Sequence, residues 1–198
     1  MKVTLTNTTK KLCVIGDPVL HSKSPLIQNA MISAFGLDYI YLCQPVPKGR
    51  VGEWLKAASV AGYAGFNATM PHKEELVGWM DSLDPLAEKC GAVNTVCIKN
   101  GEYYGFNTDG PGFLRALTEL TGEGWGKRVL LLGAGGAAKA VGLALVNSNN
   151  LVTACNRSVT KSEALCDLDP DRMTPAGFSP GELKRLAEEC DVLVNCTP

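Results

Sequence analysis

The 198-residue sequence lacks an excess of charge of either sign. Its 19 lysine and arginine residues nearly balance its 20 aspartate and glutamate residues, which leaves a formal net charge of −1. Such a chain has no general positive field that would hold nucleic acid or an anionic membrane. We therefore expect small molecules bound at local sites as its partners and no nucleic acid. Composition does not set the oligomeric state, for which a homodimer is one candidate.

Long hydrophobic runs are also missing. The longest apolar stretch, residues 129–146, is rich in glycine and is interrupted by Lys139, whereas a membrane span requires about 18 unbroken apolar residues. Near the N-terminus, residues 12–16 form an apolar run that is too short for the core of a signal peptide. The sequence therefore predicts no membrane partner and a cytoplasmic location.

No two cysteines have the spacing of a zinc ligand pair or of a CxxC redox motif. The eight cysteines stand at positions 13, 43, 90, 97, 155, 166, 190 and 196, and none lies within four residues of another. A secreted chain would tend to pair its thiols in disulfides. We therefore expect the reduced, mostly buried thiols of a cytosolic enzyme, and no metal site.

What the sequence does contain is an alternation of strand and helix patterns in a chain of ordinary globular composition, with 45% hydrophobic and 20% charged residues. Short apolar runs predict strands at residues 12–15, 39–44, 65–69, 129–132, 151–155 and 192–196. Amphipathic segments predict helices at residues 25–35, 49–60, 110–120, 137–146 and 181–190. This order is typical of βαβ units, and it predicts an α/β fold with mainly parallel sheets.

Two further features divide the chain. Strand patterns at residues 92–99 and 103–106 meet at Asn100-Gly101, which predicts a hairpin with a type I′ turn. A glycine-rich segment, residues 122–126, precedes a fresh βαβ pattern, so we place a domain boundary near Gly110. The prediction is two domains, residues 1–109 and residues 110–198. The second shows at most three strands, fewer than the two βαβαβ halves of a dinucleotide-binding domain, so we expect it to be incomplete.

A glycine-rich loop follows the strand predicted at residues 129–132. Its sequence, GAGGAA, fits the GxGxxA fingerprint of dinucleotide-binding folds. In that fingerprint Gly133 allows the tight turn, Gly135 lets the backbone approach a pyrophosphate, and Ala138 keeps helix and strand close. A P-loop is excluded, because Ala138 and Ala140 stand where it requires glycine and serine or threonine. A tight strand-to-helix turn without a ligand is the alternative.

The choice between NAD and NADP depends on the end of the next predicted strand. NAD-type sites place an acidic residue about 20 positions after the glycine loop, where it binds the ribose 2′-hydroxyl. Here the strand ends in Asn156-Arg157-Ser158, and no carboxylate occurs before Glu163. Arg157, with Ser158 and Lys161, could bind a 2′-phosphate by charge-assisted hydrogen bonds. The sequence therefore favours NADP, with a solvated Arg157 as the alternative.

In the first predicted domain, polar groups gather where strands end. Ser22 and Ser24 stand two apart at the start of a predicted helix, where hydroxyl and backbone N–H groups can bind an anion such as a carboxylate. The alternative is that Ser24 is simply the N-cap of that helix. From the residues alone, the two interpretations are equally supported.

Two ionisable residues lie at other strand ends. A pair formed by Lys73 and Asp109 could take a proton from a substrate hydroxyl, with one group orienting the other and tuning its pKa. Thr69 and Asn94 would then hydrogen-bond neighbouring hydroxyls. Taken alone, Lys73 also fits a surface lysine and Asp109 also fits a helix cap.

Six motifs stand in an order and spacing that resemble the shikimate dehydrogenase family, which includes quinate/shikimate dehydrogenases. They are GDPVLHSKSP, NATMPHK, GAVNT, GFNTDG, GAGGAAKA and NRSVTK, and they run over nearly the whole chain. The resemblance implies an N-terminal α/β substrate-binding domain facing a Rossmann-type NADP-binding domain across a cleft. It also implies NADP-dependent, reversible reduction of 3-dehydroshikimate to shikimate in aromatic amino-acid biosynthesis. The alternatives are a dual-specificity quinate/shikimate dehydrogenase and a module that binds nucleotide or substrate without turnover.

Residue by residue, the resemblance implies Lys73 as the catalytic acid/base beside Asp109, and it implies no metal. The substrate-binding residues it implies are Ser22 and Ser24 for the carboxylate, Thr69, Asn94 and Asp109 for the ring hydroxyls, and Asn67 in support. The cofactor-binding residues it implies are Gly133, Ala134, Gly135, Gly136 and Ala137 for the pyrophosphate, with Asn156, Arg157, Ser158 and Lys161 for the adenosine ribose and its 2′-phosphate.

Family members run well beyond the NCTP with which this sequence ends. That further part normally completes the cofactor sheet, returns a final helix to the first domain, and carries a substrate-contacting glutamine and nicotinamide contacts. The resemblance therefore predicts that this chain is a truncated form with an incomplete Rossmann domain.

Overall fold

The computed structural model describes residues 5–122 and 126–197. The chain divides into two compact units, unit 1 ending at Asn107 and unit 2 beginning at Thr108. Part of the glycine-rich segment that guided the predicted boundary, residues 123–125, lies outside the described residues.

Unit 1 is built on one six-stranded sheet with the order β2-β1-β3-β5-β6-β4. Its strands are β1 (Lys10–Gly16), β2 (Tyr39–Pro45), β3 (Tyr63–Ala68), β4 (Ser82–Leu83), β5 (Thr95–Lys99) and β6 (Glu102–Phe106). β1, β2 and β3 run parallel, whereas β5 is antiparallel to both β3 and β6. The carboxyl ends of β1, β2 and β3 and the start of β5 therefore lie at one edge of the sheet.

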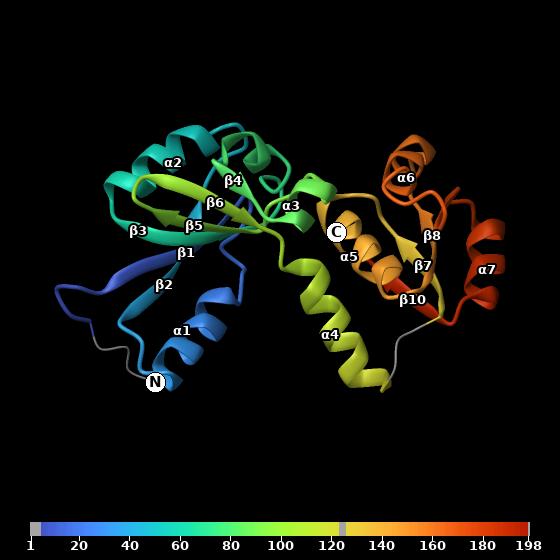
Figure 1. Cartoon of the computed structure of the whole chain (residues 1–198), viewed down its shortest axis with the longest axis horizontal. Coiled ribbons are helices and arrows are strands. Elements are labelled where there is room, and N and C mark those ends of the chain that lie inside the picture. Colours follow the sequence, from blue (N-terminus) through green and yellow to red (C-terminus); the bar gives the residue numbers. More distant parts are fainter. Residues whose placement is uncertain (1–4, 123–125, 198) are drawn as a thin grey trace. The chain divides into compact units, whose positions relative to one another are not determined.

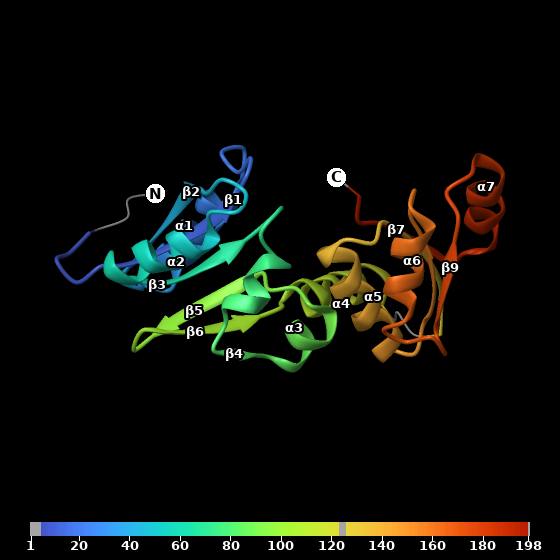
Figure 2. The same cartoon turned by 90° about the horizontal axis from the view of Figure 1, so that it is seen from above.

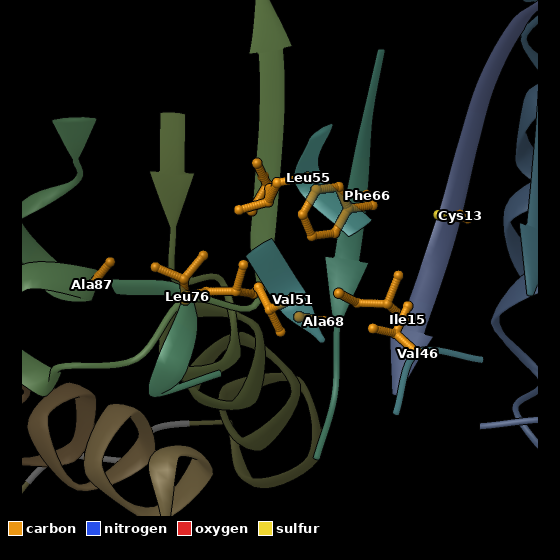
Figure 3. Packing of buried hydrophobic residues seen from close by; sticks show 11 residues of the cluster. Cys13, Ile15, Val46, Val51, Leu55, Phe66, Ala68, Leu76 and Ala87 are labelled. Atoms are coloured by element: carbon orange, nitrogen blue, oxygen red, sulfur yellow. The ribbon is translucent and has the colours of Figure 1, made fainter. Parts of the chain in front are cut away.

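The helices of unit 1 cover the two faces of this sheet differently. They are α1 (Ser24–Ala34), α2 (Val51–Val60), the 3-10 helix η1 (Glu75–Trp79) and α3 (Pro85–Cys90). Side chains from α2, η1 and α3 pack with alternate residues of β1 and β3 in one core, which Figure 3 shows around Leu55 and Phe66. Helix α1 lies on the other face of the sheet (Figure 1). There Ile32 packs with Val14 and Tyr41 in a second, smaller core.

The predicted hairpin is confirmed. β5 and β6 pair antiparallel on either side of Asn100-Gly101, and both turn residues have positive φ, 56° and 82°. A type I′ turn requires φ above zero at both central positions, which asparagine and glycine tolerate best.

Unit 2 contains a four-stranded parallel sheet with the order β10-β7-β8-β9. Its elements are α4 (Asp109–Thr121), β7 (Arg128–Leu132), α5 (Gly136–Asn147), β8 (Leu151–Cys155), α6 (Val159–Cys166), β9 (Met173–Ala176), α7 (Pro180–Glu189) and β10 (Val192–Asn195). Within this unit, α5 and α6 lie on one side of the sheet and α7 lies on the other (Figures 1 and 2). This is the arrangement of a Rossmann-type half.

The expectation of at most three strands in this unit was wrong, because β9 is a fourth. β9 lies at the edge of the sheet, contains Pro175 and buries only Met173, so its sequence carries no apolar run. The short elements α3, β4 and α6 were not predicted either. α6 buries only Ser162, Leu165 and Cys166 along eight residues, which gives a weak amphipathic pattern.

The described residues contain no membrane-spanning helix, no cluster of metal ligands and no disulfide. Among residues 5–122 and 126–197, no helix combines the length and the apolar character that crossing a bilayer requires. Over the same ranges, no three histidine, cysteine or acidic side chains come together in a way that would hold a metal ion. None of the eight cysteines, all of which are described residues, forms a disulfide; Cys13, Cys90, Cys155 and Cys166 are buried.

Candidate active site

The candidate residues of unit 1 come from loops at one edge of its sheet. Ser22 and Ser24 follow β1, Lys73 follows β3, and Asn94 immediately precedes β5. Because β5 runs antiparallel to β3, the residue before β5 lies beside the end of β3, and Thr95 pairs with Asn67 in the ladder. The topology therefore places these four residues on neighbouring loops.

The loop after β1 forms a compact turn into α1. The N–H of Ser22 donates to the carbonyl of Val19 at 2.9 Å, and the N–H of Ser24 donates to Ser22 Oγ at 3.2 Å. The two hydroxyl oxygens lie 3.1 Å apart. Ser24 is the first residue of α1, and the N-cap is Lys23, whose side chain makes no capping bond. The N-cap interpretation of Ser24 was therefore wrong, and both hydroxyls lie at the helix start.

The loop after β3 is fixed on both sides of Lys73. Thr69 N–H donates to the carbonyl of Ile15 at 2.9 Å, and the carbonyl of Lys73 accepts from Val93 N–H at 2.8 Å. Between them, the fully buried imidazole of His72 donates from Nε2 to the carbonyl of Val46 at 2.8 Å. A carbonyl only accepts, so this contact fixes the proton of His72 on Nε2. Lys73 itself is half-buried.

A side-chain network connects the sheet to Asn94. Tyr41 Oη lies 2.7 Å from Asn67 Oδ1, and Asn67 Nδ2 donates to Thr95 Oγ1 at 3.0 Å. Thr95 Oγ1 in turn donates to Asn94 Oδ1 at 2.9 Å. Asn94 is buried. The amides of two candidate residues, Asn67 and Asn94, are thus held through hydrogen bonds to other side chains.

Asp109 belongs to unit 2, whereas Lys73 belongs to unit 1. Asp109 is the first residue of α4, behind Thr108 at the N-cap position, and it is half-buried. A carboxylate in the first turn of a helix is stabilised by the helix dipole.

The glycine loop has the conformation that its sequence predicts. Gly133 has φ of +108°, and a Cβ there would lie 2.9 Å from the carbonyl oxygen of Cys196. At Gly135, the N-cap of α5, a Cβ would meet nothing within 4 Å, and no side chain caps the helix. Gly135 has no side chain with which to cap the backbone N–H groups of the first turn, which begins Gly136-Ala137. Such a helix start can bind a phosphate.

The loop after β8 holds the remaining candidates. Asn156 Nδ2 donates to the carbonyl of Ser158 at 3.2 Å, and the N–H of Lys161 donates to the same oxygen at 3.1 Å. Ser158 Oγ lies 2.8 Å from Thr160 Oγ1. Arg157 and Lys161 are exposed, so this loop presents two cations at the carboxyl end of a strand next to β7.

Comparison with known proteins identifies the family. The family model described as shikimate dehydrogenase substrate binding domain matches residues 14–96. A shikimate dehydrogenase (NADP(+)) from Alkaliphilus metalliredigens is 36% identical over 203 aligned positions, which cover 100% of this chain and 71% of the relative. The chain belongs to the shikimate dehydrogenase family.

Solved structures of this family share the fold. The crystal structure of shikimate dehydrogenase from Aquifex aeolicus has a TM-score of 0.90 and 36% identity, over 98% of this chain and 71% of that chain. Shikimate 5-dehydrogenase from Thermus thermophilus, solved in complex with NADP(H) and shikimate, has a TM-score of 0.84 and 36% identity, over 95% of this chain and 68% of that one.

For this member of the shikimate dehydrogenase family, sequence reasoning missed Tyr41 and Thr95 as contacts of the candidate residues, and it left His72 as either an orienting or a surface group. Tyr41 lies in an apolar strand, 26 positions before its partner Asn67, and nothing local marks the pair. Thr95 carried a signal, because it stands within the GAVNT motif. His72 also stands within a motif, NATMPHK, but its burial follows only from the fold.

The close packing of Gly16 leads to a testable prediction about the loop after β3, which contains Thr69. A Cβ at Gly16 would lie 2.5 Å from Thr69 Cγ2 and 3.1 Å from the carbonyl oxygen of Met70. Gly16→Ala is therefore expected to displace that loop, to lower the free energy of unfolding by about 1–3 kcal/mol, and to raise the KM of a substrate bound through Thr69. Thermal melts and steady-state kinetics measure both effects. In the control, Gly78→Ala, the added Cβ meets nothing within 4 Å. A Gly16→Ala protein as stable and active as this control would contradict the prediction.

Proposed function

We propose that this chain is an NADP-dependent shikimate dehydrogenase, which reversibly reduces 3-dehydroshikimate to shikimate. The observation that carries the proposal is 36% identity, over the whole chain, to an enzyme named shikimate dehydrogenase (NADP(+)). The local geometry is compatible with it. One sheet edge gathers hydroxyl, amide and ammonium groups, and a separate glycine loop precedes an uncapped helix.

Each unit has one role in this proposal. Unit 1 binds the substrate, which is supported by the family model of the substrate binding domain that matches residues 14–96. Unit 2 binds the cofactor, which is supported by its Rossmann-type half and by the glycine loop after β7. The proposed domains are residues 1–109 and 110–198, with the break between the compact units at Asn107.

Substrate recognition is assigned to the loops of the sheet edge and to the start of α4. The hydroxyls of Ser22 and Ser24, 3.1 Å apart at the start of α1, bind the substrate carboxylate. The ring hydroxyls are bound by Thr69, Asn94 and Asp109, and Asn67 supports Asn94 through Thr95.

Proton transfer is assigned to Lys73, with Asp109 as the orienting carboxylate. When NADP+ is bound, it supplies the hydride acceptor for the substrate carbon that carries the hydroxyl. Lys73 Nζ takes the hydroxyl proton during oxidation and returns it to the carbonyl oxygen during reduction. The backbone bond from Val93 to the Lys73 carbonyl and the buried His72 hold the lysine's main chain in place.

The NADP site is assigned to the loops after β7 and β8. The backbone of Gly133, Ala134, Gly135, Gly136 and Ala137 would hold the pyrophosphate, and Asn156, Arg157, Ser158 and Lys161 would hold the adenosine ribose and its 2′-phosphate. The residues fit the group: the helix start has no side-chain cap, Gly135 leaves open space, and two exposed cations stand on the second loop. An arginine and a lysine can bind the doubly charged 2′-phosphate.

Two further assignments belong to this proposal. A cytoplasmic location is supported by eight cysteines, all described, that form no disulfide, since thiols persist in a reducing compartment. A homodimer is the proposed assembly, because two-fold dimers are the commonest soluble oligomers. Light scattering of the purified protein measures the oligomeric state.

The reaction is tested by following the hydride. Shikimate deuterated at C3 is incubated with the protein and NADP+, and the reduced cofactor is analysed by mass spectrometry. The proposal expects one deuterium in the nicotinamide ring of NADPH. Shikimate deuterated at C4 is the control and should give unlabelled NADPH. Absence of NADPH, or NADPH without the C3 label, would overturn the proposed function.

A further inference from the structure

The main-chain carbonyl of Asn94 defines which atoms donate and which accept in the side-chain network beside it. The main-chain carbonyl of Asn94 can only accept a hydrogen bond. Asn67 Nδ2 lies 3.3 Å from that oxygen, so the donor end of the Asn67 amide faces Asn94. The opposite end, Asn67 Oδ1, therefore faces the hydroxyl of Tyr41 at 2.7 Å, and this hydroxyl must donate.

The hydrogen bonds from Asn67 to the Asn94 side chain also have a defined direction. Asn67 Nδ2 also donates to Thr95 Oγ1, which therefore acts as an acceptor towards Asn67. Asn94 Oδ1 lies 2.9 Å from Thr95 Oγ1, and because an amide oxygen only accepts, the Thr95 hydroxyl donates to it. With Oδ1 facing Thr95, the other end of the Asn94 amide is Nδ2, a donor. The direction of every bond from Tyr41 to Asn94 is thus determined.

Tyr41 is held firmly at the start of this chain of bonds. Its backbone N–H donates to Asn29 Oδ1 at 2.9 Å, and its carbonyl accepts from Asn29 Nδ2 at 2.8 Å, so helix α1 pairs with the edge strand β2. The side chain is 3% exposed and packs with Val14 and Ile32. Burial, with smaller effects of two nearby cysteines, raises the pKa of Tyr41, so the phenol keeps its proton and donates.

We propose that Tyr41 and Thr95 are positioning residues for substrate specificity, which orient the amide of Asn94 so that its Nδ2 donates to an oxygen of the bound substrate. The inference rests on the proposed function, and it deepens it by giving the polarity of the Asn94 contact. An amide that presents a donor binds an oxygen acceptor, such as a ring hydroxyl or carbonyl, and disfavours a group that can only donate. Neither Tyr41 nor Thr95 needs to touch the substrate for this effect.

The test is the substitution Tyr41→Phe in this protein. Without the phenol, Asn67 Oδ1 is left without a donor, and the free-energy cost of this unsatisfied oxygen favours movement of the Asn67 amide away from Thr95 and Asn94, which loosens their orientation. The contact at Asn94 exists in both the ground state and the transition state, so its loss changes KM rather than kcat. The expected result is a KM for shikimate raised about tenfold, with kcat within about twofold and the KM for NADP+ unchanged.

Tyr103→Phe is the matched control, because it also removes a phenol that donates to a buried acceptor in the same unit, here the carbonyl of Leu55 at 3.0 Å. This variant should lose comparable thermal stability and keep the wild-type KM. A second pair of variants tests the next hydrogen bond, from Thr95 to Asn94. Thr95→Val should raise the KM for shikimate as Tyr41→Phe does. Thr95→Ser keeps the hydroxyl and should have the wild-type KM for shikimate. These variants keep the test valid if Tyr41→Phe does not fold.

The outcomes separate the inference from the proposed function. If the wild-type protein does not oxidise shikimate with NADP+, the proposed function fails, and the inference fails with it. If the wild-type protein is active but Tyr41→Phe has the same KM as Tyr103→Phe, and Thr95→Val the same as Thr95→Ser, the positioning role alone is overturned. If the wild-type protein is active and the KM for shikimate is raised only in Tyr41→Phe and Thr95→Val, both the proposed function and the positioning role are supported.

Discussion

Replacing Lys73 by alanine is expected to lower kcat by a factor of about 10²–10⁴, with little change in the KM for shikimate, which is the usual effect of removing one general acid/base. The reason is that the hydroxyl oxygen would then release its proton without a positioned acceptor as the hydride leaves. The Lys73 main chain is hydrogen-bonded through Val93, and that bond is unaffected by the substitution. Steady-state measurement of NADPH absorbance gives kcat and KM separately.

Lys99→Ala is the control for loss of a lysine. Lys99 is exposed at the far end of β5, away from the edge that carries the candidate residues. It should keep wild-type kcat and KM. A Lys73→Ala protein that is folded and retains near-normal kcat would remove Lys73 from the proposed mechanism, whatever the affinity for shikimate.

Replacing Arg157 by alanine is expected to weaken NADP+ binding by about 10- to 100-fold, because a charge-assisted hydrogen bond to a phosphate contributes about 1.5–3 kcal/mol. NAD+ lacks the 2′-phosphate, so its affinity should change little, and the preference for NADP+ should fall by the same factor. Titration calorimetry with each cofactor measures both affinities. Because Arg157 is exposed, the difference should also shrink at high salt.

Arg115→Ala is the matched control for Arg157. Arg115 is an exposed arginine of the same unit, where it donates from Nε to Glu119 Oε1 at 3.0 Å on helix α4. It should leave both cofactor affinities unchanged. An Arg157→Ala protein with an undiminished preference for NADP+ would show that this arginine is a solvated loop charge, and the 2′-phosphate site would have to be sought elsewhere.

The parallel strands and the longer helices could be predicted from the sequence because their burial is local and periodic. The apolar runs of β1 and β7 and the apolar helix α5 are examples, as is the hairpin at Asn100-Gly101, whose residues suit positive φ. β9 could not be predicted. It has one buried residue and a proline, and it is a strand only because β8 pairs with it.

In the candidate site, too, the features set by local sequence could be predicted and those set by strand pairing could not. Ser22, Lys73 and Asn94 could be proposed because each stands in a short motif at the end or start of a strand. Tyr41 could not, since its hydroxyl reaches Asn67 across the intervening strand β1, a contact that depends on strand order and register. Local sequence therefore predicted which residues line the strand ends, but not which buried side chains orient them.

The activity of this chain is decided by the rate of reduced-nicotinamide formation, followed by absorbance, with each pairing of shikimate or quinate with NADP+ or NAD+. We expect kcat/KM to be highest for shikimate with NADP+, and the replacement of NADP+ by NAD+ to lower it. Highest activity with quinate would instead indicate the dual-specificity alternative. No turnover of any pair by folded protein would contradict the assignment of this chain as an NADP-dependent shikimate dehydrogenase.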